Sequence, residues 1–431
     1  MTLTLILFAI TVISMLALVF VKPAVHIGRW AISIFWVPPV LGVLAVLLFG
    51  ILSFGEIGSG LVADTAVNPI EILVLFFSMT LLSVFLDEAG VFRYLAGQVM
   101  RHAGSGQKKL FVALYVTVSV LTVFTSNDII VLTFTPFICY FAKHAKIDPL
   151  PFLFCEFVAA NTWSMMLIIG NPTNIYLGGS GGILFADYLA NMWLPTVLAG
   201  VVSFLVLFLL FHRQLSRKIS GEAPEILPMD KPAALLGTVM LGGCVVLLVL
   251  SSYLSLPMWL IAAAFCMAEY LLAIAMQLAR RQGLRLPMRS LLRAPLDVAP
   301  FVLSMFVLVM ALNKVGFTAL VADFLAGERA VWGYGVASCL FANILNNIPM
   351  SVLFSSVYAA GGTAFGIAPL LAAVIGSNVG AFLTPMGALA GIMWMAMLRE
   401  QGVKLSFLRF SLYGVIVCVP TLLAALLGLM I

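Results

Sequence analysis

The chain carries one pattern of interrupted apolar segments twice, and this repetition limits the folds that it can adopt. Each copy has an amphipathic segment, then a long apolar stretch broken by Asn, then a stretch broken by Pro and small polar residues. The breaks lie at 126–128 and 170–174 in the first copy and at 345–347 and 383–387 in the second. Matching polar interruptions in two halves of a membrane protein indicate a transporter's binding site. The pattern therefore predicts a transporter.

The composition agrees with a membrane protein. Hydrophobic residues make up 63% of the 431 residues and charged residues only 9%, against about 25% charged in an average soluble domain. Apolar runs of about 20 residues, which is enough to cross a bilayer, recur along the chain. We therefore expect a multi-pass protein of the plasma (inner) membrane. The six cysteines have no disulfide or metal-ligand spacing and are expected in the core.

Several functional classes are not expected from this sequence. It shows no soluble domain, no nucleotide-binding glycine loop and no metal-binding motif, so we predict neither an enzyme nor a bound cofactor or metal. The net charge of +5 is attributed to cytoplasmic loops and not to a surface for nucleic acid.

The basic residues orient the chain in the membrane. With the basic loops in the cytoplasm, as the positive-inside rule requires, the segments near Glu56 and 323–328 lie outside. Residues 108–146 then start and finish inside and turn back near 126–128, whereas residues 330–360 start and finish outside. The repeats are therefore predicted to be inverted, with two re-entrant hairpins that point at each other across a polar cavity.

The predicted fold class is an all-α polytopic membrane protein with two inverted repeats, each containing a re-entrant hairpin and a broken transmembrane helix. We expect N-terminal spans at 1–69, a first repeat at 70–212, cytoplasmic loops and connecting spans at 213–296, and a second repeat at 297–431. The parts of the repeats are the hairpin 108–146 and broken helix 150–190 in the first, and the hairpin 330–360, broken helix 366–398 and last span 406–430 in the second.

The four breaks supply polar groups for binding a small solute. Helix N-termini offer backbone N–H groups, unwound carbonyls suit a cation, and Asn and Thr side chains both donate and accept. The predicted substrate-binding residues are Ser126, Asn127, Asn171, Thr173, Asn174, Asn346, Asn347, Asn378 and Thr384. For Asn343, Ser377 or Thr162 taken alone, a hydrogen bond to a neighbouring helix is an equally good interpretation. No Lys or Arg lies in the breaks, which disfavours a site for a polyanion.

Acidic residues inside apolar segments are candidates for binding the coupling ion. An ionised acid within a span costs at least about 2.5–3.5 kcal/mol, so it is a functional candidate by default. Asp128 is the predicted proton carrier or sodium ligand, and it is also placed to cap the second hairpin helix. Glu156 is the second candidate. Glu269 lies outside both repeats and is expected to form a structural pair.

Several of these motifs resemble those of the ion transporter superfamily, and most closely those of the arsenical pump membrane protein (ArsB) and NhaD-type permease family. Residues 127–136, with Asn-Asp followed by Thr-Pro, resemble the family's first hairpin tip, and Asn-Asn-Ile-Pro at 346–349 resembles its second. The segments 171–175 and 376–390 resemble its two helix breaks. The similarity extends over nearly all of residues 1–431.

The resemblance implies a scaffold domain, which includes the spans at 1–69, and a transport domain that moves as a rigid body in an elevator mechanism. It also implies a homodimer. Our leading hypothesis is proton-coupled efflux of a small neutral or weakly charged oxyacid, arsenite or antimonite first, because As(OH)₃ is mostly neutral at pH 7. A sodium/proton exchanger and a sodium- or proton-coupled carboxylate or anion symporter are the alternatives. Docking of a soluble ATPase partner is left open.

Overall fold

The computed structural model describes the chain except residues 22–23, 28–29, 63–67, 103–105, 218, 220–227, 282 and 362–365. Its N-terminal part contains three helices, α1 (Thr2–Val21), α2 (Val37–Leu48) and α3 (Phe54–Val62). It also contains one antiparallel pair of four-residue strands, β1 (Ala24–Ile27) and β2 (Trp30–Ser33). These strands are the exception in a chain that we expected to be all-α and that is otherwise helical where it is described.

The remaining helices follow the same order twice. The first set is α4 (Pro69–Glu88), α5 (Val91–His102), α6 (Gln107–Phe124), α7 (Asn127–Ala145), α8 (Leu150–Trp163), α9 (Pro172–Ser180) and α10 (Phe185–Leu215). The second set is α14 (Val298–Lys314), α15 (Phe317–Leu325), α16 (Ala330–Leu345), α17 (Asn347–Gly361), α18 (Ala368–Gly380), α19 (Leu389–Glu400) and α20 (Phe407–Leu429). Between the sets are α11 (Lys231–Leu254), α12 (Met258–Ala279) and α13 (Arg285–Leu292).

The two sets share their turning points. In each, the first long helix is followed by a glycine with positive φ, Gly90 (88°) or Gly316 (79°), from which a short helix departs in a new direction. Glycine adopts this conformation without steric cost because it has no Cβ. At Gly316 the chain bends by 81° between α14 and α15.

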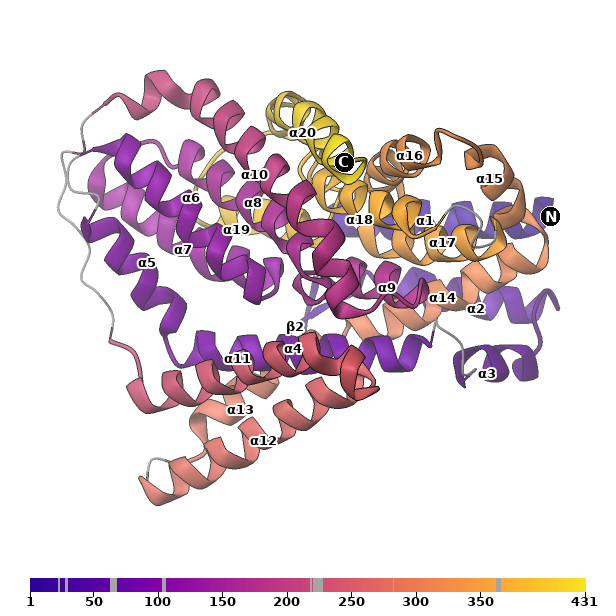
Figure 1. The fold of residues 1–431 in the computed structure, drawn as a ribbon, viewed down its shortest axis with the longest axis horizontal. Coiled ribbons are helices and arrows are strands. Elements are labelled where there is room, and N and C mark those ends of the chain that lie inside the picture. The colour runs from indigo at the N-terminus through magenta and orange to yellow at the C-terminus, as the bar shows by residue number, and fades with distance from the viewer. Residues whose placement is uncertain are drawn as a thin grey trace.

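The helical hairpins α6–α7 and α16–α17 lie in opposite halves of the molecule (Figure 1). Their packing crosses between the halves, because α7 packs against α19 and α17 packs against α9. The second helix of each hairpin therefore contacts the second part of the other half's broken helix. Both hairpin tips and both helix breaks are brought into the interior by this arrangement.

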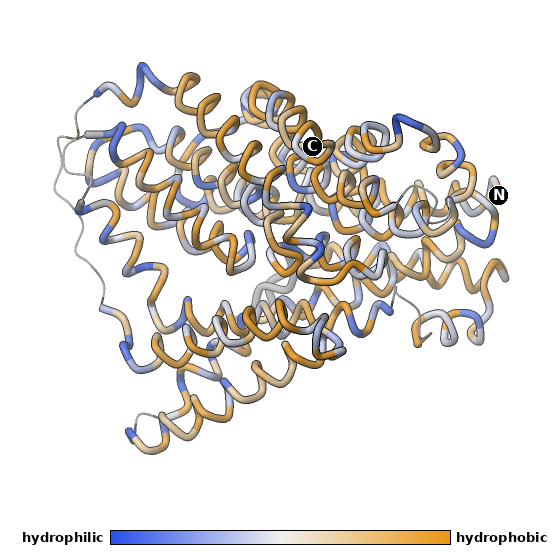
Figure 2. The backbone as a smooth tube through the Cα atoms, in the orientation of Figure 1, coloured by the Kyte–Doolittle hydropathy of each residue, from blue (hydrophilic) through white to orange (hydrophobic). Residues whose placement is uncertain are grey.

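Apolar residues dominate almost every helix, whereas hydrophilic residues gather at helix ends and at the centre (Figure 2). Six described helices are long and apolar enough to cross a membrane, and the bent pair α14–α15 is a seventh by the same test. The six are α4, α6, α10, α12 and α20 with residues 231–251 of α11. Because α6 is among them, its length alone does not require it to turn back within the bilayer.

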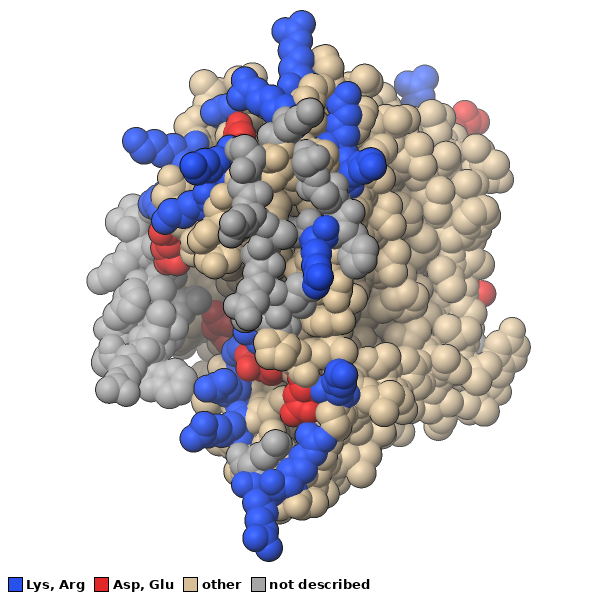
Figure 3. Space-filling model, turned by 90° about the vertical axis from the view of Figure 1, so that its left-hand side faces the viewer, with Lys and Arg blue, Asp and Glu red and all other residues tan. Residues whose placement is uncertain are grey.

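Charged side chains gather at one end of the molecule. The face at which α5, α6 and α7 lie is rich in Lys and Arg, with few acidic residues (Figure 3). The positive-inside rule assigns such a face to the cytoplasm. In the described part of the chain, the acidic partners of basic side chains are Asp230 for Arg280, Asp87 and Glu88 for Arg293, and Glu56 for Lys314. Hydrogen bonds from Lys314, and from the backbone N–H and hydroxyl of Ser53, lower the pKa of Glu56 to about 2.

Helices α16 and α18 approach each other closely because small residues line their contact. A Cβ atom on Gly376 of α18 would collide with the hydroxyl of Ser338 and with the carbonyl oxygen of Gly335, both on α16. Backbone atoms cannot move aside as a flexible side chain can, so this position requires glycine. The close contact brings α16 against the second helix break.

We predict that Gly376→Ala lowers stability by about 1–3 kcal/mol, the usual cost of overpacking a tight contact. The midpoint of thermal unfolding of the purified protein measures it. Gly242→Ala in α11 is the control, because nothing lies within 4 Å of a Cβ there and alanine favours a helix. A Gly376→Ala protein as stable as the wild type would contradict the close packing.

Candidate functional site

The first helix break lies between α8 and α9. After α8 the chain forms two short 3₁₀ turns, Ser164–Met166 and Ile168–Gly170, and α9 then begins at Pro172. Proline suits a first helical position because it has no N–H to satisfy. The side chain of Asn171 caps α9 by accepting a hydrogen bond from the backbone N–H of Thr173 at 3.2 Å. The Asn-Pro pair therefore stops one helix and starts the next.

Asn378, in the last turn of α18, connects the two broken helices. Its Oδ1 accepts hydrogen bonds from the Ser164 hydroxyl (2.9 Å) and from the Asn171 amide (3.0 Å). Its Nδ2 donates to Oδ1 of Asn174 at 2.7 Å and to the Val374 carbonyl at 2.9 Å. The Asn174 amide in turn donates to the carbonyls of Ser164 and Leu167. We call Ser164, Asn171, Asn174 and Asn378 the amide cluster; all four are buried.

The second break, between α18 and α19, is held from the other side by the second hairpin. Asn343 of α16 donates to the carbonyl of Gly380 (2.9 Å), and its Oδ1 accepts from the backbone N–H (3.0 Å) and the hydroxyl (2.6 Å) of Thr384. Asn346, at the tip with φ of 76°, donates to the Met386 carbonyl at 3.2 Å. These side chains satisfy backbone groups that the interrupted helix leaves free.

Each hairpin tip also presents a buried oxygen atom without a partner. Nδ2 of Asn127 donates to Oδ1 of Asn161 at 3.1 Å, which fixes the orientation of the amide, and its own Oδ1 has no hydrogen bond among the described residues. Oδ1 of Asn347 is unpaired in the same way. A buried unpaired acceptor costs about 1–3 kcal/mol. Both tips therefore offer acceptors to a ligand that can donate.

A cavity of about 160 Å³ lies beside the tips, and we call it the inner cavity. Its polar walls come from the first hairpin tip (Ser126, Asp128), from Thr80 of α4, and from Arg293 and Asp297 near α13 and α14. Pro172 of the first break, Ile348 beside the second tip and three residues of α19 are among its other lining residues. Both halves of the chain therefore contribute to one cavity.

Arg293 is a cation of the inner cavity that is already paired. Its Nη1 lies 2.7 Å from Oδ2 of Asp87 and 2.7 Å from Oε1 of Glu88, at the end of α4. Asp87 is buried. Two carboxylates therefore hold one guanidinium, so Arg293 brings no unbalanced positive charge to the cavity.

The other two candidate acids lie away from the inner cavity. Glu156 of α8 is fully buried and accepts hydrogen bonds from the Thr135 hydroxyl at 2.9 and 3.1 Å. Glu269 of α12 is also buried, but neither carboxylate oxygen has a partner among the described residues. The expected structural pair for Glu269 is therefore wrong. All six cysteines are buried, as expected, and no group of metal-binding side chains occurs among the described residues.

Apart from Glu156, the sequence-predicted site residues fall into three groups. Asn171, Asn174 and Asn378 share the amide cluster, with Thr173 beside them on α9. Asn346 and Thr384 belong to the support of the second break. Ser126 and Asp128 line the inner cavity, and Asn127 and Asn347 are the sequence neighbours of lining residues.

Sequence reasoning missed Ser164 and Arg293. Ser164 precedes the Asn-Pro break and could have been found as one more small polar residue in an apolar segment. Arg293 gave no usable signal, because in the sequence it belongs to a basic run that also marks a cytoplasmic loop. Only the fold brings it to the cavity that contains Asp128.

Broken helices that cross at a buried amide cluster, inside an apolar helical bundle, are typical of a membrane transporter. The chain belongs to the citrate transporter family (CitMHS), whose model matches residues 16–373. The protein is therefore an integral, multi-pass membrane protein, as the sequence predicted.

Similar proteins agree with this assignment. The arsenical pump membrane protein of Escherichia coli is 27% identical over 410 residues, covering 90% of this chain and 91% of the relative. The putative arsenical pump membrane protein of Bacillus subtilis is 25% identical over 92% of this chain and 96% of its own. The resemblance to the arsenical pump family is thereby confirmed. In fold, the chain is similar to the YdaH transporter of Alcanivorax borkumensis (TM-score 0.56, 14% identity, 99% and 97% of the two chains covered).

We predict that Asn378→Ala destabilises the protein strongly, because the Asn171 amide and the Asn174 Oδ1 lose a partner at a cost of about 1–3 kcal/mol each. Ser377→Ala is the matched control. The neighbouring hydroxyl is buried without a hydrogen bond, so its removal should be neutral. Thermal unfolding midpoints of the two variants decide; equal midpoints would show that the amide cluster contributes nothing to stability.

Proposed function

We propose that the protein exports a small neutral oxyacid, arsenite or antimonite first, in exchange for protons. The observation that carries the proposal is the pair of unpaired acceptor oxygens on Asn127 and Asn347. As(OH)₃ is neutral at pH 7 and has three O–H donors, and we propose that one molecule pairs with both acceptors. Similarity to proteins named arsenical pump membrane proteins supports the same cargo.

The charge and size of the inner cavity also favour a small uncharged solute. Arg293 is matched by Asp87 and Glu88, and Asp128 and Asp297 add further acidic groups. None of the residues that line this cavity is an unpaired Lys or Arg that could balance the charge of a polyanion. The volume of about 160 Å³ is below the 300–1,000 Å³ of sites for drug-sized ligands.

A carboxylate symporter is the second candidate, because the family is described as citrate transporters and Arg293 lines the cavity. Asp87 and Glu88 already hold Nη1 of Arg293, so a carboxylate bound to the remaining N–H donors would be the third anion around one guanidinium. Repulsion between these like charges ranks the symporter second. A sodium/proton exchanger is the third candidate, since amide and carboxylate oxygens also suit Na⁺.

The proposed architecture is two inverted repeats that alternate access by an elevator movement of a transport domain against a scaffold. The repeated order of elements supports the repeats, and the basic face at one end of the molecule supports their orientation. A homodimer is part of the wider proposal, and docking of a soluble ATPase partner stays open. Asp128 is the proposed proton carrier because it lies at the hairpin tip in the cavity wall. Glu156 is proposed as a second protonatable group.

We predict that a proton gradient across inverted membrane vesicles drives arsenite uptake by the wild-type protein and that Asp128→Asn abolishes it. The variant keeps a side chain of the same shape but loses the titratable group. Asp323→Asn, an exposed acid on α15, is the control and should transport normally. Proton movement with citrate or sodium, but not with arsenite, would overturn the proposed cargo.

We also predict that Asn127 and Asn347 act on one cargo molecule. Each change to Ala should weaken arsenite binding about tenfold to a hundredfold, which corresponds to about 1–3 kcal/mol. Because both side chains would contact the same ligand, the loss in the double variant should differ from the sum of the single losses. Strictly additive losses, or no loss at all, would place the cargo elsewhere.

A further inference from the structure

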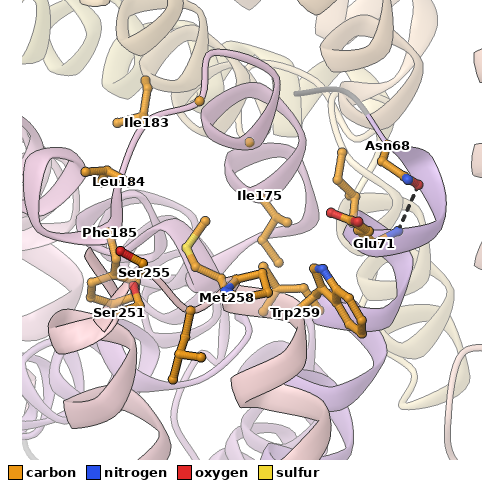
Figure 4. Close-up of a pocket in the computed structure, with 16 residues that line it drawn as sticks. Asn68, Glu71, Ile175, Ile183, Leu184, Phe185, Ser251, Ser255, Met258 and Trp259 are labelled. Atoms are coloured by element: carbon orange, nitrogen blue, oxygen red, sulfur yellow. Dashed lines mark hydrogen bonds between the residues drawn. The ribbon is translucent and has the colours of Figure 1, made fainter. Parts of the chain in front are cut away.

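A second and larger cavity, of about 490 Å³, lies between the start of α4, the end of α9 and the connection from α11 to α12 (Figure 4). We call it the outer cavity. Neither the family resemblance nor the proposed cargo path gives it a role. Its volume falls within the 300–1,000 Å³ that is typical of sites for organic ligands.

The walls of the outer cavity are mostly apolar and carry one acidic side chain, Glu71. Ile72, Leu75, Ile175 and Ile183 provide aliphatic surface, whereas none of the lining residues is Lys or Arg. Figure 4 shows Glu71 on the same side of the cavity as Trp259 of α12 and Asn68. Asn68 is occupied in capping α4, since its Oδ1 accepts from the backbone N–H groups of Ile70 and Glu71.

The carboxylate of Glu71 has no partner among the described residues, in contrast to three other acids on α4 and at the start of α11. On the same helix, Asp87 and Glu88 are paired with Arg293, and Asp230 at the start of α11 is paired with Arg280. No ion pair or hydrogen bond of the Glu71 carboxylate occurs among the described residues. The side chain is half-buried, so water screens its charge only in part. The cavity therefore has an unbalanced negative charge on an apolar wall.

Two neighbours of Glu71 suit a cation with an organic body. Trp259 and Met258, at the start of α12, both line the outer cavity and are half-buried. The face of an indole ring attracts ammonium groups, most strongly where water is partly excluded, and the flexible Met side chain packs against varied apolar shapes. The chemistry thus combines an anionic point, an aromatic face and an aliphatic wall.

We propose that the outer cavity binds an amphiphilic amine, with its ammonium group between Glu71 and Trp259 and its apolar body against the aliphatic wall. The ligand would contact α4 and α12 on one side and α9 and the segment that leads to α10 on the other. It would therefore hold these elements together and slow any movement between them. The amine can be a free solute or the headgroup of an aminophospholipid.

Isothermal titration of the purified protein in phosphatidylglycerol nanodiscs, which contain no amine, tests the proposal. The probes are 4-phenylbutylamine and its neutral counterpart 4-phenyl-1-butanol. The amine should bind about tenfold more tightly than the alcohol, and Glu71→Gln should remove this difference, because charge-assisted contacts are roughly twice as strong as neutral ones. Asp187→Asn, an exposed acid near the cavity but not in its wall, should leave it unchanged.

Equal affinities for amine and alcohol, or an unchanged preference in Glu71→Gln, would overturn the proposal. If Glu71→Gln does not fold, the wild-type comparison still decides once the signal of protein-free phosphatidylglycerol nanodiscs is subtracted, because a charge-dependent site must also lose amine affinity in high salt. Nanodiscs that contain phosphatidylethanolamine separate the sources: weaker binding of added amine identifies the lipid headgroup as occupant, and unchanged binding identifies a free amine. The titration requires no transport, so it is independent of the proposed cargo.

Discussion

Asn378 lies where two interrupted helices cross, and its hydrogen bonds hold that crossing together. An interrupted helix leaves backbone groups unpaired, and inside a bilayer no bulk water is present to satisfy them. An amide side chain solves this problem because it donates and accepts at the same time. Asn378 links Ser164, Asn171 and Asn174 of the first break to the last turn of α18. Asn343 does the same for the second break, so both irregular segments can remain buried.

The sequence revealed the interruptions but not the contacts between them. Asn-Pro at 171–172 predicts a helix stop followed by a helix start from local chemistry alone, and the structure has α9 begin there. The hydrogen bond from Asn378 to Asn174 joins residues 204 positions apart, and no local rule reports such a pair. Glu269 shows the reverse error. Because burying an unpaired acid is costly, we expected Glu269 to have a partner. Both of its carboxylate oxygens are nevertheless unpaired among the described residues.

The absence of basic residues from the four breaks does not extend to the inner cavity. No basic residue occurs in the four breaks, but Arg293 reaches the inner cavity from the connection between α13 and α14. Its effect depends on its partners rather than on its presence. Because Asp87 and Glu88 both lie 2.7 Å from one guanidinium nitrogen, the ion-paired group is net acidic. Counting charges along the sequence could not show that this cation is already neutralised.

The crossed packing of the two halves explains why one site can arise from two copies of one pattern. The tip of the first hairpin belongs to α7, which packs against α19 of the second half, and α17 packs against α9 of the first half. Neither half can therefore build the surroundings of its own tip. Asp128 shares the inner cavity with Ile348 and with residues of α19, so a shift of either half changes the surroundings of the acid. In the proposed mechanism, a protonation change at Asp128 and a movement of the halves would act on the same contacts, as coupled transport requires.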